Sequence, residues 1–181
     1  MSNKKFPRIY SLSTVGIRNH YNSDYRFHPF RTDFAGDSGV GKSIIADVLQ
    51  LILVGEREFK SATDSSSERE ARKLIIERYG YVFLNIAIDT DKFIVIGMYI
   101  STTSIDPFII QANIGLDVFE PLSSPLISKD FMSGDEIIDI TNLPERMKEN
   151  KQAYAAKLSL NKYHESVSYT HLRAHETTLH L

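Results

Sequence analysis

Eight consecutive residues in the first quarter of the chain have the composition and spacing of a phosphate-binding loop. They are Gly36, Asp37, Ser38, Gly39, Val40, Gly41, Lys42 and Ser43, and they match G-x-x-x-x-G-K-[ST] at every fixed position. In such a loop, glycines let several backbone N–H groups converge on phosphate oxygens. We expect Lys42 to neutralise the outer phosphates and the Ser43 hydroxyl to ligate Mg²⁺. The motif predicts a site for a nucleotide, with ATP and Mg²⁺ as the expected cofactors.

The residues around the motif predict the elements that must position it. A P-loop joins a strand to a helix, and Phe30–Ala35 is the predicted strand. Ser43–Val54 is apolar on nearly all sides and Gly55 follows it, which predicts a buried helix that ends at the glycine. We expect this helix to pack on a sheet, to be covered on its other side, and to direct its positive dipole end at the bound anion.

A β-hairpin is predicted before the loop. The first strand is Ile9–Ile17, and its alternation places Ile9, Val15 and Ile17 on one face and Tyr10 and Leu12 on the other. The polar segment 18–24 is the predicted turn or short loop. Tyr25, Phe27 and Phe30 predict a second strand, which Pro29 interrupts.

The clearest β pattern lies further along the chain. Tyr81–Ile88, Lys92–Thr102 and Pro107–Asn113 predict an antiparallel meander, with Asp89–Asp91 as a tight turn. Val82, Leu84, Ile86 and Ile88 lie on one face of the first strand, and Phe83 and Ala87 lie on the other. Because both faces are apolar, we expect the meander either to be covered on both sides or to have lost part of its cover by truncation of the chain.

The remaining segments give weaker patterns. The polar run 56–67 predicts a loop, either flexible or folded over a nucleotide or a partner subunit. Helices are predicted at Glu68–Tyr79, which Gly80 ends, and at Pro144–Ser159. Between them, Gly115–Ser133 is a predicted loop and Gly134–Thr141 contains a predicted short strand.

The composition limits the class of protein. The chain has 181 residues, of which 42% are hydrophobic and 24% charged, so it is long enough for one globular domain with a core. It contains no cysteine, which excludes disulfides, cysteine-ligated zinc and a thiol nucleophile. No apolar run approaches the roughly 20 residues that a membrane span needs. We therefore expect a cytoplasmic protein with no membrane partner. The net charge of −2 does not by itself favour nucleic acid.

The last residues differ in character from the rest. Val167–Thr177 reads VSYTHLRAHET and resembles the translation of a sequencing adapter. We expect residues 1–166 to be the N-terminal part of a longer P-loop protein and residues 167–181 to be a non-native tail. His171 and His175 are four residues apart beside Glu176, but they lack the H-E-x-x-H order of a helical metal site.

The order of hairpin, P-loop, apolar helix and β-meander resembles the N-terminal lobe of SMC-like and ABC-type ATPase heads. The closest group is the prokaryotic condensin-like one, with MukB- and JetC-like ATPases. The resemblance covers residues 9–113 and depends most on GDSGVGKS and the helix after it. Ser38 departs from the family, since many members have Asn there. The implied fold is α/β, a P-loop NTPase lobe with an antiparallel β-meander, truncated before its second half.

The resemblance also implies function and partners. Such proteins bind ATP between two heads, which dimerise on ATP binding and separate on hydrolysis, and they act on DNA in chromosome maintenance, repair or defence. The missing half would carry the Walker B acid and the signature motif. Arg18 and Asn19 would lie near the adenine and ribose, and Gln111 is the candidate second residue at Mg²⁺. The catalytic residues of the chain remain unassigned.

Two other functions stay open. The chain is alternatively a nucleotide or small-molecule kinase, with Asp89 after a strand as its metal-side acid, although Asp89–Asp91 is also an ordinary hairpin turn. A GTPase is the other alternative. It is weakened because residues 161–164 read NKYH and lack the Asp that reads guanine.

Overall fold

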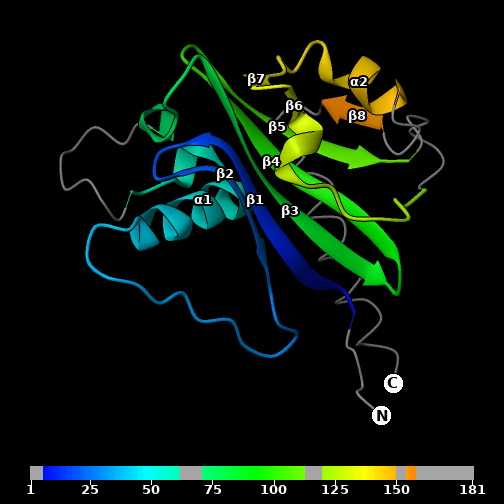
Figure 1. The fold of residues 1–181 in the computed structure, drawn as a ribbon. Coiled ribbons are helices and arrows are strands. Elements are labelled where there is room, and N and C mark those ends of the chain that lie inside the picture. Colours follow the sequence, from blue (N-terminus) through cyan, green and yellow to red (C-terminus); the bar gives the residue numbers. More distant parts are fainter. Residues whose placement is uncertain (1–5, 62–70, 113–119, 150–153, 158–181) are drawn as a thin grey trace.

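A computed structural model of the protein describes residues 6–61, 71–112, 120–149 and 154–157 (Figure 1). Its helices and strands are β1 (Arg8–Ile17), β2 (His20–Arg26), α1 (Lys42–Val54), η1 (Glu56–Glu58), η2 (Ala71–Leu74), β3 (Tyr79–Asp89), β4 (Lys92–Ser101), β5 (Ile105–Gln111), η3 (Ser128–Phe131), β6 (Met132–Ser133), β7 (Glu136–Ile137), α2 (Leu143–Glu149) and β8 (Tyr154–Lys157). The fold is mixed α/β and is dominated by an antiparallel sheet with two helices.

The main sheet has the strand order β2-β1-β3-β4-β5-β8, and every neighbouring pair is antiparallel. The predicted meander is confirmed as β3-β4-β5, with a tight turn in which the Thr90 N–H donates to the Asp89 carboxylate at 2.7 Å. The predicted hairpin is confirmed as β1-β2, but its second strand lies earlier than expected. β2 begins at His20, which shortens the turn, and ends at Arg26, so that Phe27 and Phe30 lie outside it. β1 also pairs with β3, and this pairing joins the hairpin to the meander.

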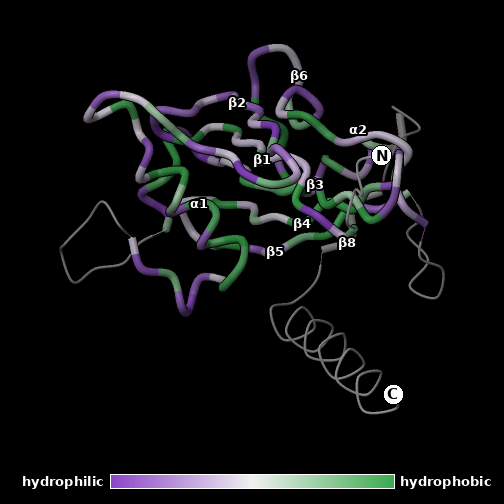
Figure 2. Tube along the Cα trace, turned by 90° about the horizontal axis from the view of Figure 1, so that it is seen from below, coloured by the Kyte–Doolittle hydropathy of each residue, from purple (hydrophilic) through white to green (hydrophobic). Residues whose placement is uncertain are grey.

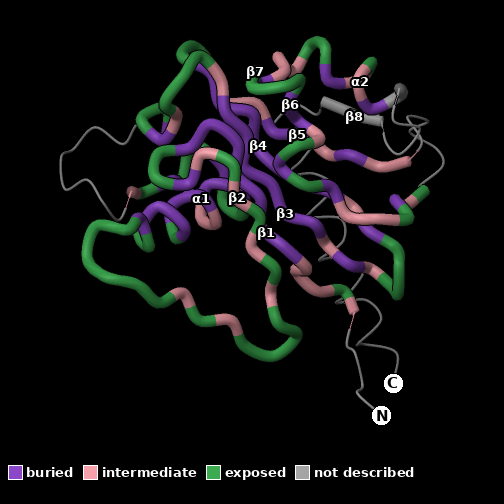
Figure 3. The backbone as a smooth tube through the Cα atoms, viewed as in Figure 1, coloured by how far each residue is buried: buried purple, intermediate pink, exposed green. Residues whose placement is uncertain are grey.

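Helix α1 covers one face of the sheet (Figure 1). Its bounds agree with the prediction, and the Gly55 N–H donates to the Leu51 carbonyl at 3.0 Å where the helix ends. The apolar cluster on this face is buried and combines strand and helix residues: Leu12, Ile17, Ile44, Ile45, Val48, Leu51, Ile52, Phe59, Val82, Leu84, Met98 and Ile100. Figure 3 shows these strands and the inner side of α1 as buried.

The outer side of α1 is covered only in part. Ser61 Oγ donates to the Asp47 carboxylate at 2.9 Å, and the Lys60 N–H donates to Gln50 Oε1 at 2.7 Å. The segment after the helix therefore covers its two polar positions. Leu53, on another side, is 55% exposed. The expectation that α1 is covered on its outer side is thus confirmed for its polar positions. Among the described residues, nothing covers Leu53 to the same extent.

The opposite face of the sheet is covered by η3, the β6-β7 hairpin and α2 (Figure 1). Its buried cluster is rich in aromatic rings and includes Tyr81, Phe83, Tyr99, Phe108, Phe131, Leu143 and Met147. Asn85 in β3 connects this layer to the sheet through three hydrogen bonds of 2.8 Å. Its Nδ2 donates to Ser11 Oγ and to the Leu126 carbonyl, and its Oδ1 accepts from the Leu126 N–H. The prediction that both faces are covered is confirmed, and the hydrophobic segments concentrate in the strands and α1 (Figure 2).

The side-chain faces predicted for β1 are correct for Ile9, Ile17 and Tyr10 but wrong for Leu12 and Val15. Leu12 packs in the α1-side cluster with Ile17 and Ile9, whereas Val15 and Tyr10 pack on the opposite side. The pairing of β1 with β3 shifts by one residue between Ile9 and Ser11, and Gly16 has a φ of 69°. Each irregularity reverses the alternation of side chains along a strand.

The strand predicted at Phe30–Ala35 is not formed. Residues 27–41 contain no helix or strand, and Phe30 is 79% exposed. A strand requires a neighbour for its backbone N–H and C=O groups, and no described strand pairs with this segment. Phe34 anchors it to the end of β2, with its ring 5.6 Å from the ring of Tyr25 and 5.9 Å from that of Phe27.

The helix predicted at Glu68–Tyr79 is also wrong where it is described. Only Ala71–Leu74 forms a short 3₁₀ helix, and Tyr79 already belongs to β3. The end of β1 takes the backbone groups that a longer helix would use. The Arg18 N–H donates to the Leu74 carbonyl at 2.9 Å, and the Ile76 N–H donates to the Gly16 carbonyl at 3.0 Å.

The remaining predictions are met in part. Pro144–Ser159 contains α2 except for its first residue, Leu143, but Tyr154–Lys157 forms a strand because β5 offers an open edge. The short strand expected in Gly134–Thr141 is β7, and η3 and β6 lie within the predicted loop Gly115–Ser133. The tail 167–181, with His171, His175 and Glu176, and the segment 161–164 lie outside the described residues.

Gly97 in β4 provides a test of this packing. A Cβ atom there would lie 2.5 Å from the Val82 carbonyl oxygen, 2.6 Å from Phe83 Cβ and 2.6 Å from Phe108 Cζ. Overpacking a buried site costs about 1–3 kcal/mol. We expect Gly97→Ala to lower the free energy of unfolding by that amount in urea titrations. Lys92→Ala, at the exposed start of the same strand, should change it by about 0.5 kcal/mol or less. Equal effects of the two substitutions would contradict the packing described here.

Candidate functional site: the loop before helix α1

The loop Gly36–Ser43 adopts a conformation that presents backbone N–H groups. Gly39 and Gly41 have φ values of 89° and 92°, in the left-handed region that glycine adopts readily. Gly41 is also the N-cap of α1, and no side chain caps this helix end. The N–H groups of Ile44 and Ile45 donate to the Gly41 carbonyl. The N–H groups of Lys42 and Ser43, which precede them, have no acceptor within the helix and can donate to an external one. Loops of this kind form concave anion sites.

The charges of the loop also suit an anion. The first turn of α1 contains no acidic residue, so the partial positive charge of the helix end is not neutralised there. The Lys42 ammonium turns back over the loop and donates to the carbonyl oxygens of Gly36 and Asp37, the latter at 2.8 Å. Lys42 and Ser43 are both exposed. Phosphate oxygens would replace the two carbonyls as acceptors for Lys42, and the Ser43 hydroxyl is accessible to a cation.

The turn between β1 and β2 lies against this loop. Asn19 Nδ2 donates to the Gly39 carbonyl at 3.2 Å, and His20 Nε2 lies 2.9 Å from the Gly41 carbonyl. A pocket of about 480 Å³ opens between Asn19 on one side and Ser38, Gly39 and residues 41–44 on the other. Of the two residues predicted beside the nucleotide, the structure therefore brings Asn19 to the loop. Arg18 instead donates to the Lys73 carbonyl at 3.5 Å.

The other predicted site residues lie elsewhere. Asp37 contributes its carbonyl to Lys42, and the Val40 side chain is exposed beside Gly36. The sheet register places Asp89 and Gln111 together at the end far from the β1-β2 turn. From Tyr81, which pairs with Val15 near that turn, β3 runs roughly 25 Å to Asp89 at about 3.3 Å per residue. The structure does not bring Gln111 or Asp89 to Ser43.

His20 is the residue that the sequence pattern did not indicate. It lies in the polar run 18–24, which predicts only a turn. The structure buries it to 8% exposure, with Nδ1 against the Tyr25 hydroxyl and Nε2 against the Gly41 carbonyl. The sequence could have pointed to His20 only through its position next to Asn19, which was predicted to lie near the nucleotide. The contact with Gly41 joins positions that are 21 residues apart, and no local pattern reveals such a contact.

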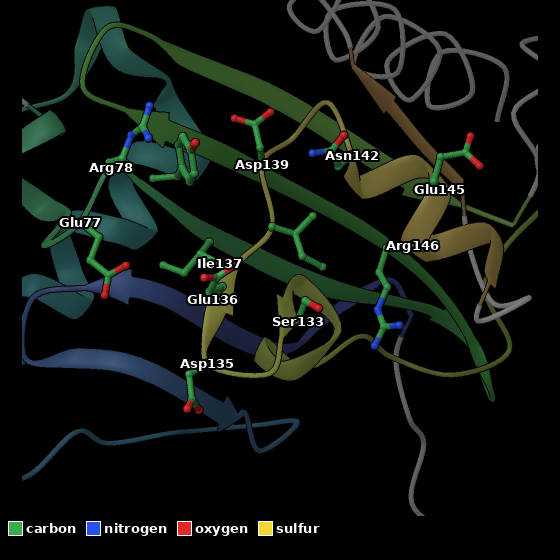
Figure 4. A pocket seen from close by; sticks show the side chains of 12 residues that line it. Glu77, Arg78, Ser133, Asp135, Glu136, Ile137, Asp139, Asn142, Glu145 and Arg146 are labelled. Atoms are coloured by element: carbon green, nitrogen blue, oxygen red, sulfur yellow. The ribbon is translucent and has the colours of Figure 1, made fainter.

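A second, larger pocket lies away from the loop, where the start of β3 meets β7 and α2 (Figure 4). It has a volume of about 650 Å³, and five of its twelve lining residues are acidic, while Arg78 and Arg146 are basic. Tyr21 beside it donates to Glu77 at 2.6 Å. In the described part of the chain, no group of three or more His, Asp or Glu side chains is arranged to hold a metal ion.

Comparison with known protein families and with curated proteins gives no match to this chain. Within the described ranges, no helix combines the length and the hydrophobicity needed to cross a membrane. Any functional assignment therefore depends on the geometry of the loop Gly36–Ser43 and of the residues in contact with it.

The two left-handed glycines provide a test of the site geometry. An alanine at either position incurs a left-handed backbone cost of about 1–2 kcal/mol. A Cβ at Gly39 meets nothing within 4 Å, whereas one at Gly41 would lie 2.6 Å from His20 Nε2 and 2.9 Å from Asn19 Cβ. We expect Gly41→Ala to lower the urea unfolding free energy more than Gly39→Ala. Equal losses would show that the loop does not lie against the turn.

Tyr21 provides a test of the electrostatics at the second pocket. The hydrogen bond to Glu77, together with burial and the charges of Glu77 and Asp135, raises the pKa of Tyr21 from 10.0 to about 12. The folded state thus holds this proton more tightly, and stability should fall as pH rises from about 10 to 12. In an absorbance titration at alkaline pH, Glu77→Gln should lower the pKa of Tyr21. Tyr21→Phe identifies which part of the signal belongs to this residue, and an unchanged curve for Glu77→Gln would contradict the assignment.

Proposed function

We propose that this chain binds Mg·ATP at the loop Gly36–Ser43 and forms the N-terminal part of an SMC-like or ABC-type ATPase head. One observation carries the proposal. An uncapped helix N-terminus follows a loop with two left-handed glycines, and Lys42 turns over that loop. Backbone N–H groups, a helix dipole and a lysine all favour a polyphosphate at this place.

Each residue of the loop has a distinct role in this proposal. Backbone N–H groups from Gly39 to Ser43 donate to the phosphate oxygens, and Lys42 exchanges its two carbonyl acceptors for the outer phosphates. Ser43 supplies its hydroxyl to Mg²⁺, which bridges phosphate oxygens when bound. Asn19, at the rim of the pocket, is placed to contact the part of the nucleotide beyond the phosphates.

Two features favour the head assignment over a smaller P-loop enzyme. Leu53 on the outer side of α1 is exposed, and Phe30–Ala35 has no strand partner in the described residues. A second lobe with parallel strands would cover Leu53 and would provide a strand partner for Phe30–Ala35. By the family resemblance, that lobe would bring the Walker B acid, and the full protein would dimerise through its heads and act on DNA.

Removing the Lys42 charge tests nucleotide binding directly. A hydrogen bond to a charged group contributes about 1.5–3 kcal/mol, so Lys42→Ala should weaken Mg·ATP binding about 10- to 150-fold in calorimetric titrations. Lys92→Ala removes a lysine at the far end of the sheet and should bind like the wild type. Retention of full affinity in Lys42→Ala would refute the proposed site.

Asp89 separates the head from the kinase alternative. The register places Asp89 far from Ser43, so Asp89→Ala should leave Mg·ATP affinity unchanged. A loss in both Asp89→Ala and Lys42→Ala would favour the kinase.

We also expect little ATP turnover by this chain alone, since the head proposal places the Walker B acid in another part of the protein. Lys42-dependent turnover at an ordinary enzymatic rate would count against the head assignment, and a clear preference for GTP would favour a GTPase.

A further inference from the structure

We propose that His20 is a positioning residue for phosphate binding, which acts by holding the Gly41 carbonyl so that the Lys42 N–H faces the bound phosphate. The inference rests on the proposed nucleotide site, and it adds a residue outside the loop motif to that site. Its basis is the contact between the imidazole and the cap of α1, which joins the antiparallel sheet to the loop.

The surroundings of His20 define which nitrogen carries the proton. The Gly41 carbonyl only accepts hydrogen bonds, so the Nε2 that lies 2.9 Å from it must donate. Nδ1 then accepts from the Tyr25 hydroxyl. Both ring nitrogens are satisfied by the neutral imidazole with its proton on Nε2. Tyr25 therefore orients the ring, and the ring in turn orients the Gly41 carbonyl.

The orientation of this carbonyl determines the direction of the next N–H group. In a trans peptide, the C=O of Gly41 and the N–H of Lys42 lie in one plane and point in opposite directions. The Gly41 carbonyl points into the helix, where it accepts from the N–H groups of Ile44 at 3.0 Å and Ile45 at 3.4 Å. The Lys42 N–H consequently points away from the helix, and Lys42 itself lines the pocket beside Asn19.

The backbone that carries His20 is itself held firmly. His20 pairs with Ile17 at the end of the hairpin, and its carbonyl accepts from Thr14 Oγ1 at 2.6 Å. The fit against the loop is also close, because a Cβ on Gly41 would lie only 2.6 Å from Nε2. A buried ring on a fixed strand, in contact with the loop, limits rotation of the Gly41–Lys42 peptide before any phosphate binds. Such preorganisation strengthens binding by reducing its ordering cost.

Substitutions that differ in reach test this role. In His20→Gln the side-chain amide can still donate at about the position of Nε2, whereas the shorter Asn in His20→Asn ends near Nδ1, and His20→Leu donates nothing. With the full chain and Mg·ADP or Mg·ATP, we expect His20→Leu and His20→Asn to weaken binding about three- to tenfold, the worth of one hydrogen bond. His20→Gln should stay within about twofold of wild type. His28→Leu, at an exposed histidine away from Gly41, is the matched control.

A second readout distinguishes positioning from general stability. The amide resonance of Lys42 should shift on addition of Mg·ADP in wild type and in His20→Gln, and should shift less in His20→Asn. If His20→Leu does not fold, the comparison of the Gln and Asn variants decides. Equal affinities and equal Lys42 shifts in those two would overturn the inference while leaving the proposed site intact. Absence of binding and of any Lys42 shift in the wild type would instead overturn the proposed site, and the role of His20 with it.

Discussion

The packing of α1 on the sheet is the interaction on which the rest of the structure depends. Ile45, Val48 and Leu51 are buried against a sheet surface that includes Leu84 and Met98. Burying side chains of this size contributes about 1.5–3 kcal/mol each. This burial determines where the helix lies, and its N-terminus then emerges beside the β1-β2 turn. The loop Gly36–Ser43 is thereby held at the hairpin rather than in open solvent.

The sheet can support α1 because its other face is closed as well. An antiparallel sheet often leaves one face in water, but here Tyr81, Phe83 and Phe108 are covered by Phe131 and its neighbours. Burial raises the pKa of Tyr81 far above its ordinary value, and its hydroxyl donates to the Ile138 carbonyl. The central strands are thus held between two apolar layers. Such a sheet presents a firm surface to the helix and to the turn that contacts the loop.

Local patterns in the sequence identified α1, β1 and the β3-β4-β5 meander, because each has a periodicity of its own. They missed contacts between distant segments. The pairing of Leu12 with Leu84 and the contact of His20 with Gly41 depend on tertiary packing. The faces of Leu12 and Val15 in β1 were mispredicted because the register shift between Ile9 and Ser11 has no signature in residue type. At the site, the motif located the loop, and Asn19, which was predicted beside the nucleotide, lies against that loop. Gln111 lies far from the loop. The sequence pattern showed that it ends a strand, but not at which end of the sheet that strand ends.

The loop keeps its conformation although no strand leads into it. Phe34 packs its ring against those of Phe27 and Tyr25, and Tyr25 in turn contacts His20, which reaches Gly41. This series of contacts ties both the incoming segment and the helix cap to residues in or directly after β2. The usual P-loop takes its entry direction from a buried parallel strand. In this chain the segment before α1 is instead positioned by an edge strand of an antiparallel sheet, through the contact of Phe34 with Tyr25 and of His20 with Gly41.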